Sequence, residues 1–413
     1  MTGSLASPLP DLPLLRHRVA PVLVLFASAA LHGVAMISFA ASSGVLKGMH
    51  HFSDTLYGTL FIGPVAMAIM GSMLGGTWAR SVGLKPMLAA SLTTATLALA
   101  GLGVMAAVPT PLAIPVAVAA TLLMGLGYGL AAAPLNTYPG LLTPAHASNT
   151  LVAMHTCFAG GLALGPAMVS VLISHGQWPL FPQLATLAGL VLLVLCLVVP
   201  FPSPANHSPE AHQPDIHWLA DPSHPARQRL FWGFVLMAFL YAMSEGTFSN
   251  WAVLYLSDNK HYPMPMATLA LSLFWASLAA TRLLVAILLN WVSARHLWQG
   301  LPLFIVLALL LIPLTQTVPT TLAGYVLAGV GCSAVFPLTM ELCIERFASH
   351  TPWAASVVTA ALMAGVGVAT FALGPLQHLA PLDTLIQGSV VFPLAMMALA
   401  WQLNQNPHQT PTT

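Results

Sequence analysis

An isolated acid lies near the middle of one long apolar segment. Residues 230–255 read LFWGFVLMAFLYAMSEGTFSNWAVLY, a run long enough to cross a bilayer that carries Glu245 close to its centre. A charged side chain at membrane depth costs roughly 2.5 to 3.5 kcal/mol on the milder insertion scales, so such a group normally faces a polar cavity and serves transport or proton transfer. We therefore expect Glu245 to face a cavity.

The candidate partner of Glu245 is Arg282, in the next apolar segment. These two are the only strongly ionisable residues well inside the predicted spans, and neighbouring antiparallel helices can bring them together. In one interpretation they form a structural ion pair, because a buried charge must be compensated. In the other, Glu245 exchanges a proton or contacts a solute, while Arg282 tunes its pKa or binds an anionic or hydroxyl-rich solute.

Two histidines lie in apolar segments. His32 and His155 can each be satisfied in a packed core by one hydrogen bond to a neighbouring helix. Histidine also titrates near physiological pH, so His32 is a candidate proton carrier. Both interpretations stay open for each residue.

Neutral polar side chains complete the candidate site. Amide, hydroxyl and aromatic groups of this kind bind sugar-like ligands, and they also form hydrogen bonds between helices. The candidates are Asn136, Tyr241, Asn250 and Trp251. Because three of them lie close to Glu245 in the sequence, we predict a solute site there.

The composition places these residues in a membrane protein. Of 413 residues, 57% are hydrophobic and 5% are charged, whereas soluble domains carry about a quarter charged residues. A spanning helix needs about 20 apolar residues, and we predict an all-α polytopic protein with twelve such spans. They lie near residues 20–44, 55–79, 86–108, 112–138, 149–174, 177–201, 229–256, 266–292, 297–316, 320–345, 353–378 and 384–403.

The distribution of cations predicts the orientation. Short cytoplasmic loops retain Lys and Arg. With the N-terminus inside, the inner loops hold Arg16, Arg18, Arg80, Lys85, Arg227, Arg229, Arg295 and Arg346, and the outer loops hold Lys47 and Lys260. We expect both termini in the cytoplasm and a multi-pass protein of a bacterial-type inner (plasma) membrane. The net charge of +1 gives no indication of a nucleic-acid partner.

The chain divides into two related halves. A polar, proline- and histidine-rich interval cannot form a core, so we predict an N-terminal six-helix bundle at 1–202, a cytoplasmic linker at 203–228 and a C-terminal six-helix bundle at 229–413. The string ALGP occurs at Ala163–Pro166 and again 209 residues later. Such matches favour two pseudo-symmetric bundles packed around a midline site.

The second predicted loop and the span count resemble the major facilitator superfamily. The signature of that superfamily in this loop is G-x-x-x-D-R-x-G-R-[RK], and the chain reads GTWARSVGLK. Gly76, Gly83 and Lys85 match, whereas Arg80 stands at the aspartate position. The resemblance implies a major facilitator fold, a gating role for this loop, and transport by rocking of one half against the other.

The chain is also similar to the fucose-permease-like branch of sugar and proton symporters. The similarity lies in GLGYGLAAAPLNTY with Asn136, NTLVAMHTCFAGGLALGP with His155, the Tyr-x3-Glu pattern of Tyr241 and Glu245 followed by Trp251, SLFWASLAATRLL with Arg282, and AVFPLTMELCIERF with Phe336 and Pro337. It implies transport of a small, sugar-like polar solute coupled to protons. The acids that such symporters carry in spans one and four are absent here, and His32 is the only ionisable group in span one.

Other functions stay open. The string GLALGP at residues 161–166 resembles the antiporter motif of proton-coupled drug exporters. A copper importer of the same superfamily would use methionine and imidazole ligands, for which the candidates are Met237, Met243, His50, His51, His261, Met264 and the linker residues His207, His212, His217 and His224. Their spacing gives no convincing ligand pair, and we assign no metal.

A multi-span membrane enzyme would need paired catalytic groups, and the nearest pair is Glu341 and Glu345. No phosphate-binding loop of the form G-x-x-x-x-G-K-[ST] occurs, so ATP is not the expected energy source. We expect a monomer in the lipid bilayer without a cofactor, whose partners are a small-molecule solute and a proton.

Overall fold

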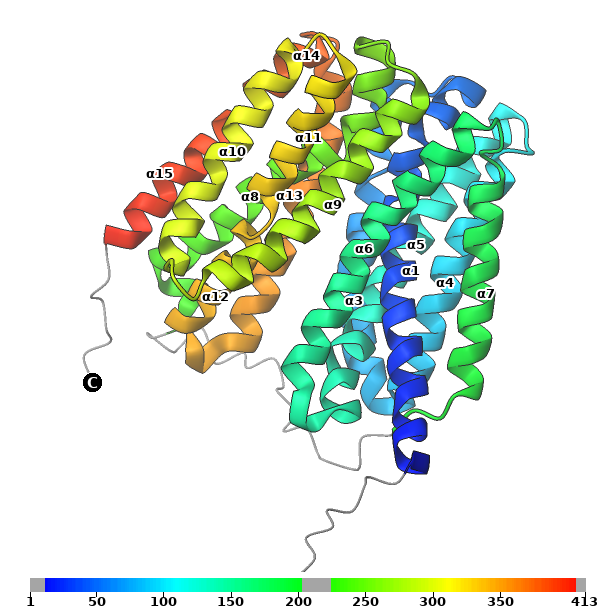
Figure 1. Cartoon of the computed structure of the whole chain (residues 1–413), viewed down its shortest axis with the longest axis vertical. Coiled ribbons are helices and arrows are strands. Elements are labelled where there is room, and N and C mark those ends of the chain that lie inside the picture. Colours follow the sequence, from blue (N-terminus) through cyan, green and yellow to red (C-terminus); the bar gives the residue numbers. More distant parts are fainter. Residues whose placement is uncertain (1–11, 203–223, 406–413) are drawn as a thin grey trace, which may run out of the picture.

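The structure, a computed structural model, describes residues 12–202 and 224–405, and the regular elements in these ranges are all helices (Figure 1). Twelve stretches of these residues have the length and composition of membrane spans, which confirms the predicted number. They are Val19–His50, Asp54–Gly75, Leu84–Met105, Thr110–Leu142, Asn149–Ser174, Leu180–Val198, Arg229–Asn259, Met264–Leu288, Ala294–Leu314, Val318–Arg346, Trp353–Leu376 and Leu382–Gln405. The protein is an integral, multi-pass membrane protein.

The helices form two bundles that lie side by side (Figure 1). The N-terminal bundle consists of α1 (Leu12–His50), α2 (Asp54–Thr59), α3 (Ile62–Val82), α4 (Leu84–Met105), α5 (Thr110–Leu142), α6 (Ala147–Ser174) and α7 (Leu180–Val198). The C-terminal bundle consists of α8 (Arg229–Leu254), α9 (Met264–Leu288), α10 (Ala294–Leu314), α11 (Val318–Cys332), α12 (Val335–Arg346), α13 (Thr351–Leu376), α14 (Leu382–Gly388) and α15 (Val391–Gln405). Most of the predicted linker, residues 203–223, lies outside the described residues.

Glycines set the closest helix contacts within the N-terminal bundle. A Cβ at Gly161 of α6 would lie 2.0 Å from the carbonyl oxygen of Ala30 in α1, and one at Gly33 would lie 2.1 Å from that of Phe158. Lipid tails are as apolar as Leu side chains, so helices in a membrane associate through such close backbone packing. The C-terminal bundle repeats the arrangement, because a Cβ at Gly365 of α13 would lie 2.4 Å from the carbonyl oxygen of Phe239 in α8.

The tenth span is broken, and its sequence explains the break. Helix α11 ends at Cys332, Ser333 and Ala334 belong to neither helix, and α12 begins at Val335. Pro337 has no amide hydrogen, and its ring clashes with the carbonyl of the residue four positions earlier, which is Ser333. The span therefore consists of two helices that meet at a hinge.

The two bundles touch at one end, which we call the closed end. Lys47 of α1 forms ion pairs with Asp54 of its own bundle and, at 2.7 Å, with Asp258 of the other bundle. Tyr57 of α2 donates a hydrogen bond to the carbonyl oxygen of Asn250 at 2.5 Å, and Ser170 of α6 donates one to that of Pro265 at 2.7 Å. Toward the opposite end, where α1 begins, the bundles diverge (Figure 1). We call this the open end.

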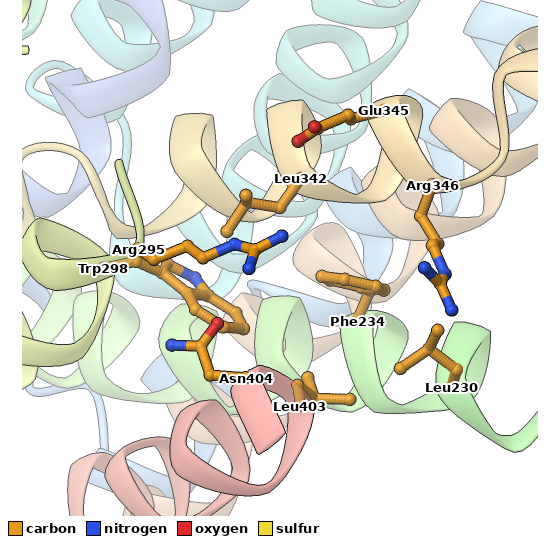
Figure 2. Close-up of a pocket in the computed structure, with 9 residues that line it drawn as sticks. All are labelled: Leu230, Phe234, Arg295, Trp298, Leu342, Glu345, Arg346, Leu403 and Asn404. Atoms are coloured by element: carbon orange, nitrogen blue, oxygen red, sulfur yellow. The ribbon is translucent and has the colours of Figure 1, made fainter. Parts of the chain in front are cut away.

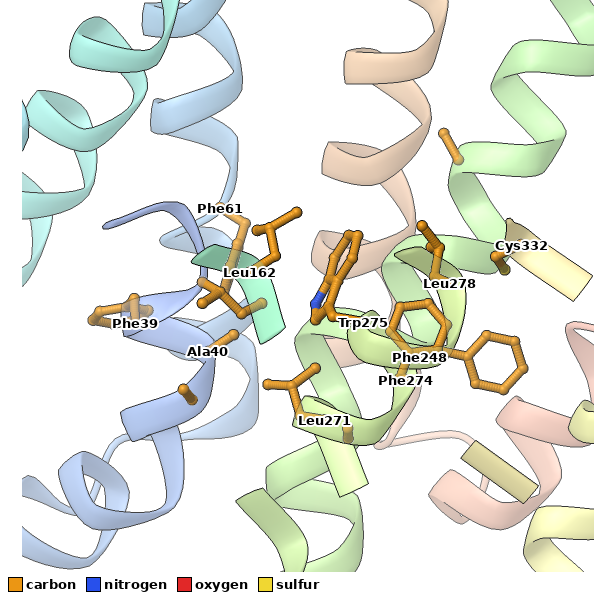
Figure 3. Packing of buried hydrophobic residues seen from close by; sticks show 14 of the residues in the cluster. Phe39, Ala40, Phe61, Leu162, Phe248, Leu271, Phe274, Trp275, Leu278 and Cys332 are labelled. Carbon is orange, nitrogen blue, oxygen red and sulfur yellow. The ribbon is translucent and has the colours of Figure 1, made fainter. Parts of the chain in front are cut away.

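Apolar side chains also pack across the interface between the two bundles, which we call the seam. Phe61 and Leu162 of the N-terminal bundle face Trp275 of α9 (Figure 3). Ser272 of α9 adds one hydrogen bond across the seam, to the carbonyl oxygen of Ala163 at 2.8 Å. The seam therefore combines close packing with few directional contacts.

Two adjacent glycines provide a test of the close helix packing. We expect Gly161→Ala to destabilise the protein by about 1 to 3 kcal/mol, because the new methyl group has no space against α1. Gly160→Ala is the matched control, since a Cβ there meets nothing within 4 Å. Thermal unfolding in detergent measures both, and equal midpoints for the two variants would contradict the packing argument.

The ion pair of Lys47 with Asp258 provides a test of the closed end. Because the pair is partly exposed, removing it with Asp258→Asn costs only about 0.2 to 1 kcal/mol of closure, which shifts the population toward opening at this end. Pulsed electron paramagnetic resonance between one label on each bundle measures the distance. The control is Asp54→Asn, which removes an ion pair within one bundle and should leave the distance unchanged. An equal shift in both variants would contradict the expectation that the ion pair of Asp258 holds the two bundles together at this end.

Candidate solute-binding site

A cavity of about 270 Å³ lies between the two bundles. Apolar and aromatic side chains form most of its wall, among them Met36, Phe61, Met124, Phe158, Trp275, Phe336 and Met363. The polar side chains that line it are Tyr128, His155, Tyr241, Glu245, Ser249, Asn250 and Arg282. The position of Glu245 in this wall agrees with the sequence prediction that the acid faces a cavity.

Glu245 is held by Tyr241, one helical turn earlier in α8. The Tyr241 hydroxyl lies within hydrogen-bonding distance of the Glu245 carboxyl group and, at 2.9 Å, of the carbonyl oxygen of Cys332. Tyr241 is almost completely buried, and its ring stacks on Phe336 of α12 with centroids 6.2 Å apart. The acid is therefore fixed to the wall through one oxygen, Oε2, and the described residues provide no hydrogen bond to Oε1.

Arg282 does not form an ion pair with Glu245, which was one of the two interpretations of the sequence. No nitrogen of its guanidinium lies within 4 Å of the Glu245 carboxylate, although both groups line the same cavity. Its Nε instead donates to the carbonyl oxygen of Ser333 at 2.8 Å. Its two terminal amino groups have no hydrogen-bond partner among the described residues, so they are available to an acceptor group in the cavity.

His155 and Asn136 lie together on the N-terminal bundle. The Nε2 atom of His155 is 3.3 Å from Oδ1 of Asn136, and both side chains are exposed. His155 lines the cavity, whereas Asn136 lies beside it toward the end of α5. His155 is therefore accessible from the space between the bundles, and Asn136 contacts it without lining the cavity.

Asn250 and Trp251 tie α8 to α13. Asn250 Nδ2 donates to Thr370 Oγ1 at 2.8 Å, and Trp251 Nε1 donates to the carbonyl oxygen of Thr370 at 3.0 Å. Trp251 is 1% exposed and also packs edge-to-face on Tyr57. Asn250 still lines the cavity, but Trp251 does not.

The structure places His32 away from the cavity. Its side chain is 2% exposed inside the N-terminal bundle, and its Nδ1 atom is 2.8 Å from the carbonyl oxygen of Ser28. Its Nε2 atom is buried without a hydrogen-bond partner among the described residues. His32 and Glu245 are therefore not brought together in this conformation.

Comparison with known proteins agrees with this geometry. A sequence profile described as the Major Facilitator Superfamily matches residues 22–375. The chain belongs to the major facilitator superfamily. It is thus a membrane transporter of this superfamily, which argues against the membrane-enzyme alternative. A search of curated protein sequences finds no significant match.

Solved structures of major facilitator transporters share the fold. A D-xylose–proton symporter matches with a TM-score of 0.74 and 15% identity, covering 93% of this chain and 96% of the other. The D323A mutant of the nucleoside transporter NupG matches with a TM-score of 0.76 and 14% identity, covering 93% and 99%. The inward-open xylose transporter XylE from E. coli matches with a TM-score of 0.74 and 15% identity, covering 94% and 96%.

The loop that resembles the superfamily signature connects α3 and α4. Gly83 has a φ of 94°, which favours glycine, and ends one helix while starting the next. Lys85 donates to the carbonyl oxygen of Leu197 at the end of α7, at 2.8 Å, and so stays within its own bundle. Gly76 and Arg80 belong to α3, but their surroundings lie outside the described residues.

Two of the candidate copper ligands, His50 and Met264, have other contacts in the structure. No group of three or more His, Cys, Asp or Glu side chains within 12–202 and 224–405 is arranged to hold a metal ion. His50 Nε2 lies 2.8 Å from the carbonyl oxygen of Met105, and the sulfur of Met264 packs on Gly44. Of the linker histidines, His207, His212 and His217 lie outside the described residues.

A second pocket, of about 140 Å³, lies at the open end of the C-terminal bundle (Figure 2). It is lined by Leu230, Phe234, Arg295, Trp298, Leu342, Glu345, Arg346, Leu403 and Asn404. The guanidinium groups of Arg295 and Arg346 flank Phe234 in this view. All of these residues belong to one bundle, so the pocket does not lie on the path between the bundles.

Substitutions of two tryptophans test which side chain contributes to solute binding and which contributes only to helix packing. We expect Trp275→Phe to change the affinity for solute severalfold, because the indole lines the cavity. Trp251→Phe removes a buried hydrogen bond to α13, which costs about 0.5 to 1.5 kcal/mol of stability, and should leave solute affinity unchanged. Concentration-dependent uptake and thermal unfolding measure the two effects. A larger affinity change in Trp251→Phe than in Trp275→Phe would contradict this assignment.

Proposed function

We propose that the protein is a secondary active transporter that moves a small organic solute by alternating access and couples the movement to protons through Glu245. The observation that supports this most is the cavity between the bundles. It is bounded by cross-bundle contacts at one end, and Glu245 and Arg282 line it. A solute held there can be released when the bundles rock.

The cation distribution supports an inward-facing orientation for this conformation. Lys85, Arg229, Arg295 and Arg346 lie at helix ends on the side of the open end, and cytoplasmic loops retain Lys and Arg. The open end and both chain termini would then face the cytoplasm. The similar XylE structure is also described as inward open.

The lining of the cavity suggests the class of solute. Glu245 Oε1 accepts hydrogen bonds and the terminal amino groups of Arg282 donate them, a combination that fits hydroxyl groups of a sugar-like molecule. Most of the remaining wall is apolar or aromatic, which favours a solute that also has an apolar face. Sugar and nucleoside transporters among the similar structures support this choice.

The same apolar wall favours one second candidate. A proton-coupled exporter of amphipathic drugs or metabolites needs a mainly apolar cavity with one titratable acid, and this cavity has both features. The GLALGP string, which resembles the antiporter motif, lies in α6 beside the cavity and provides Leu162 to its wall. The direction of transport distinguishes the two candidates.

Replacement of Glu245 tests the proton coupling. Glu245→Gln keeps the shape and hydrogen bonding of the side chain but cannot release a proton. We expect at least a tenfold loss of uptake driven by a pH gradient in proteoliposomes, whereas exchange of labelled solute at equal pH continues. The matched control is Glu341→Gln, because Glu341 is exposed on α12 and does not line the cavity.

The screen for the solute precedes this measurement. Thermal shifts with sugars, nucleosides, aromatic glycosides, cationic drugs and copper identify a ligand for the uptake assay. Unchanged gradient-driven uptake in Glu245→Gln would remove Glu245 from the coupling mechanism.

A further inference from the structure

The hinge in the tenth span leaves two backbone carbonyls without helical partners. Pro337 has no amide hydrogen to donate to Ser333. No backbone amide among the described residues donates to the carbonyl oxygen of Ser333 or to that of its neighbour Cys332. A carbonyl group inside a membrane protein needs a donor from elsewhere.

Two side chains beside Glu245 supply these donors. The Nε atom of Arg282 donates to the Ser333 carbonyl at 2.8 Å, and the hydroxyl of Tyr241 lies 2.9 Å from the Cys332 carbonyl. The same Tyr241 hydroxyl contacts the Glu245 carboxyl group. The hinge and the acid therefore share one hydroxyl group.

That hydroxyl has a single proton and two neighbouring acceptors. When Glu245 is protonated, its carboxyl hydrogen is donated to Tyr241 Oη, and Tyr241 donates its own hydrogen to the Cys332 carbonyl. When Glu245 releases its proton to water in the cavity, Tyr241 turns its hydrogen to the carboxylate, because bonds to charged acceptors are about twice as strong. The Cys332 carbonyl then loses its donor, and the protonation of Tyr241 itself does not change.

We propose that Tyr241 is a positioning residue that couples the protonation state of Glu245 to the hinge at Ser333 and Ala334. Helix α12 carries Phe336 into the cavity wall and ends at Arg346 at the open end. A change in the angle at the hinge therefore changes both the cavity and its passage. Arg282 holds the Ser333 carbonyl in both protonation states, so one of the two bonds stays fixed while the other switches.

The neighbouring ionisable groups cannot take the place of Tyr241 between Glu245 and the hinge. Arg282, Tyr128 and His155 line the same cavity, and the Cys332 thiol lies on α11. Only Tyr241 is within hydrogen-bonding distance of both the Glu245 carboxyl group and a hinge carbonyl, among the residues that the structure describes. Tyr241 contacts residues on both sides of the hinge, because its hydroxyl lies near the Cys332 carbonyl and its ring stacks on Phe336.

Hydrogen–deuterium exchange of residues 330–340 tests the coupling in detergent-solubilised protein without solute. After correction for the intrinsic pH dependence of exchange, the wild type should exchange about five- to tenfold faster when Glu245 is ionised than when it is protonated, the effect of one hydrogen bond. Glu245→Gln should exchange slowly at every pH, because its amide donates to Tyr241 as the protonated acid does. Tyr241→Phe should exchange fast at every pH.

Tyr128→Phe is the matched control, since it removes a hydroxyl from the same cavity and leaves the shared hydroxyl in place. It should keep the pH dependence of the wild type. A corrected exchange rate that still follows pH in Tyr241→Phe, or that is independent of pH in the wild type, overturns the proposal. Glu245→Gln keeps the test decisive if Tyr241→Phe does not fold.

This inference rests on the proposed function only in that Glu245 exchanges a proton during transport. The exchange measurement needs no solute and no gradient. If the protein shows the predicted exchange pattern but its uptake does not depend on the pH gradient, the result supports the hinge switch and contradicts the proposed coupling. Coupled uptake with an exchange rate independent of pH would do the reverse.

Discussion

The structure depends on one constraint, which is that polar groups inside a bilayer must find partners within the protein. The hinge before Pro337 leaves two carbonyls without backbone donors, and Tyr241 and Arg282 bind them. These side chains are thereby fixed in the wall of the cavity, which Glu245 also lines. The two residues that provide hydrogen bonds to the hinge carbonyls therefore also form part of the wall of the candidate site.

Close packing of helices holds each bundle together. Glycines at 33 and 161 let α1 and α6 approach until a Cβ would touch the facing backbone, and Gly365 does the same for α8 and α13. Such contacts resist sliding within a bundle, because interiors tolerate neither voids nor overlap. Between the bundles, a partly exposed ion pair and a few hydrogen bonds at the closed end accompany close packing of the same kind, because a Cβ at Gly374 would lie 2.6 Å from the carbonyl oxygen of Asp54 and one at Gly58 would lie 2.9 Å from that of Thr370. Opening of this end must separate both sets of contacts.

Much of the fold could be predicted from the sequence, because span length and composition are local properties. The twelve spans, the two bundles and the cavity position of Glu245 follow from apolar runs and one acid. The partner of Arg282 could not be predicted, since it depends on how α9 faces the hinge, although Pro337 was a visible signal for that hinge. Trp275 was missed as a lining residue because an aromatic side chain in an apolar helix has the same pattern whether it faces a cavity or a core.

The polar groups of the cavity are distributed unevenly, and this has a mechanical consequence. Glu245, Arg282 and Tyr241 belong to the C-terminal bundle, whereas the N-terminal bundle contributes a mainly apolar wall with Tyr128 and His155. Directional hydrogen bonds to a solute would break if the two bundles each held half of it while they rocked. A solute bound to the C-terminal bundle keeps those bonds through the movement, because an apolar wall can slide past it without losing directional contacts. Under the proposed transport mechanism, this asymmetry gives recognition of the solute to the C-terminal bundle and its occlusion to the N-terminal bundle.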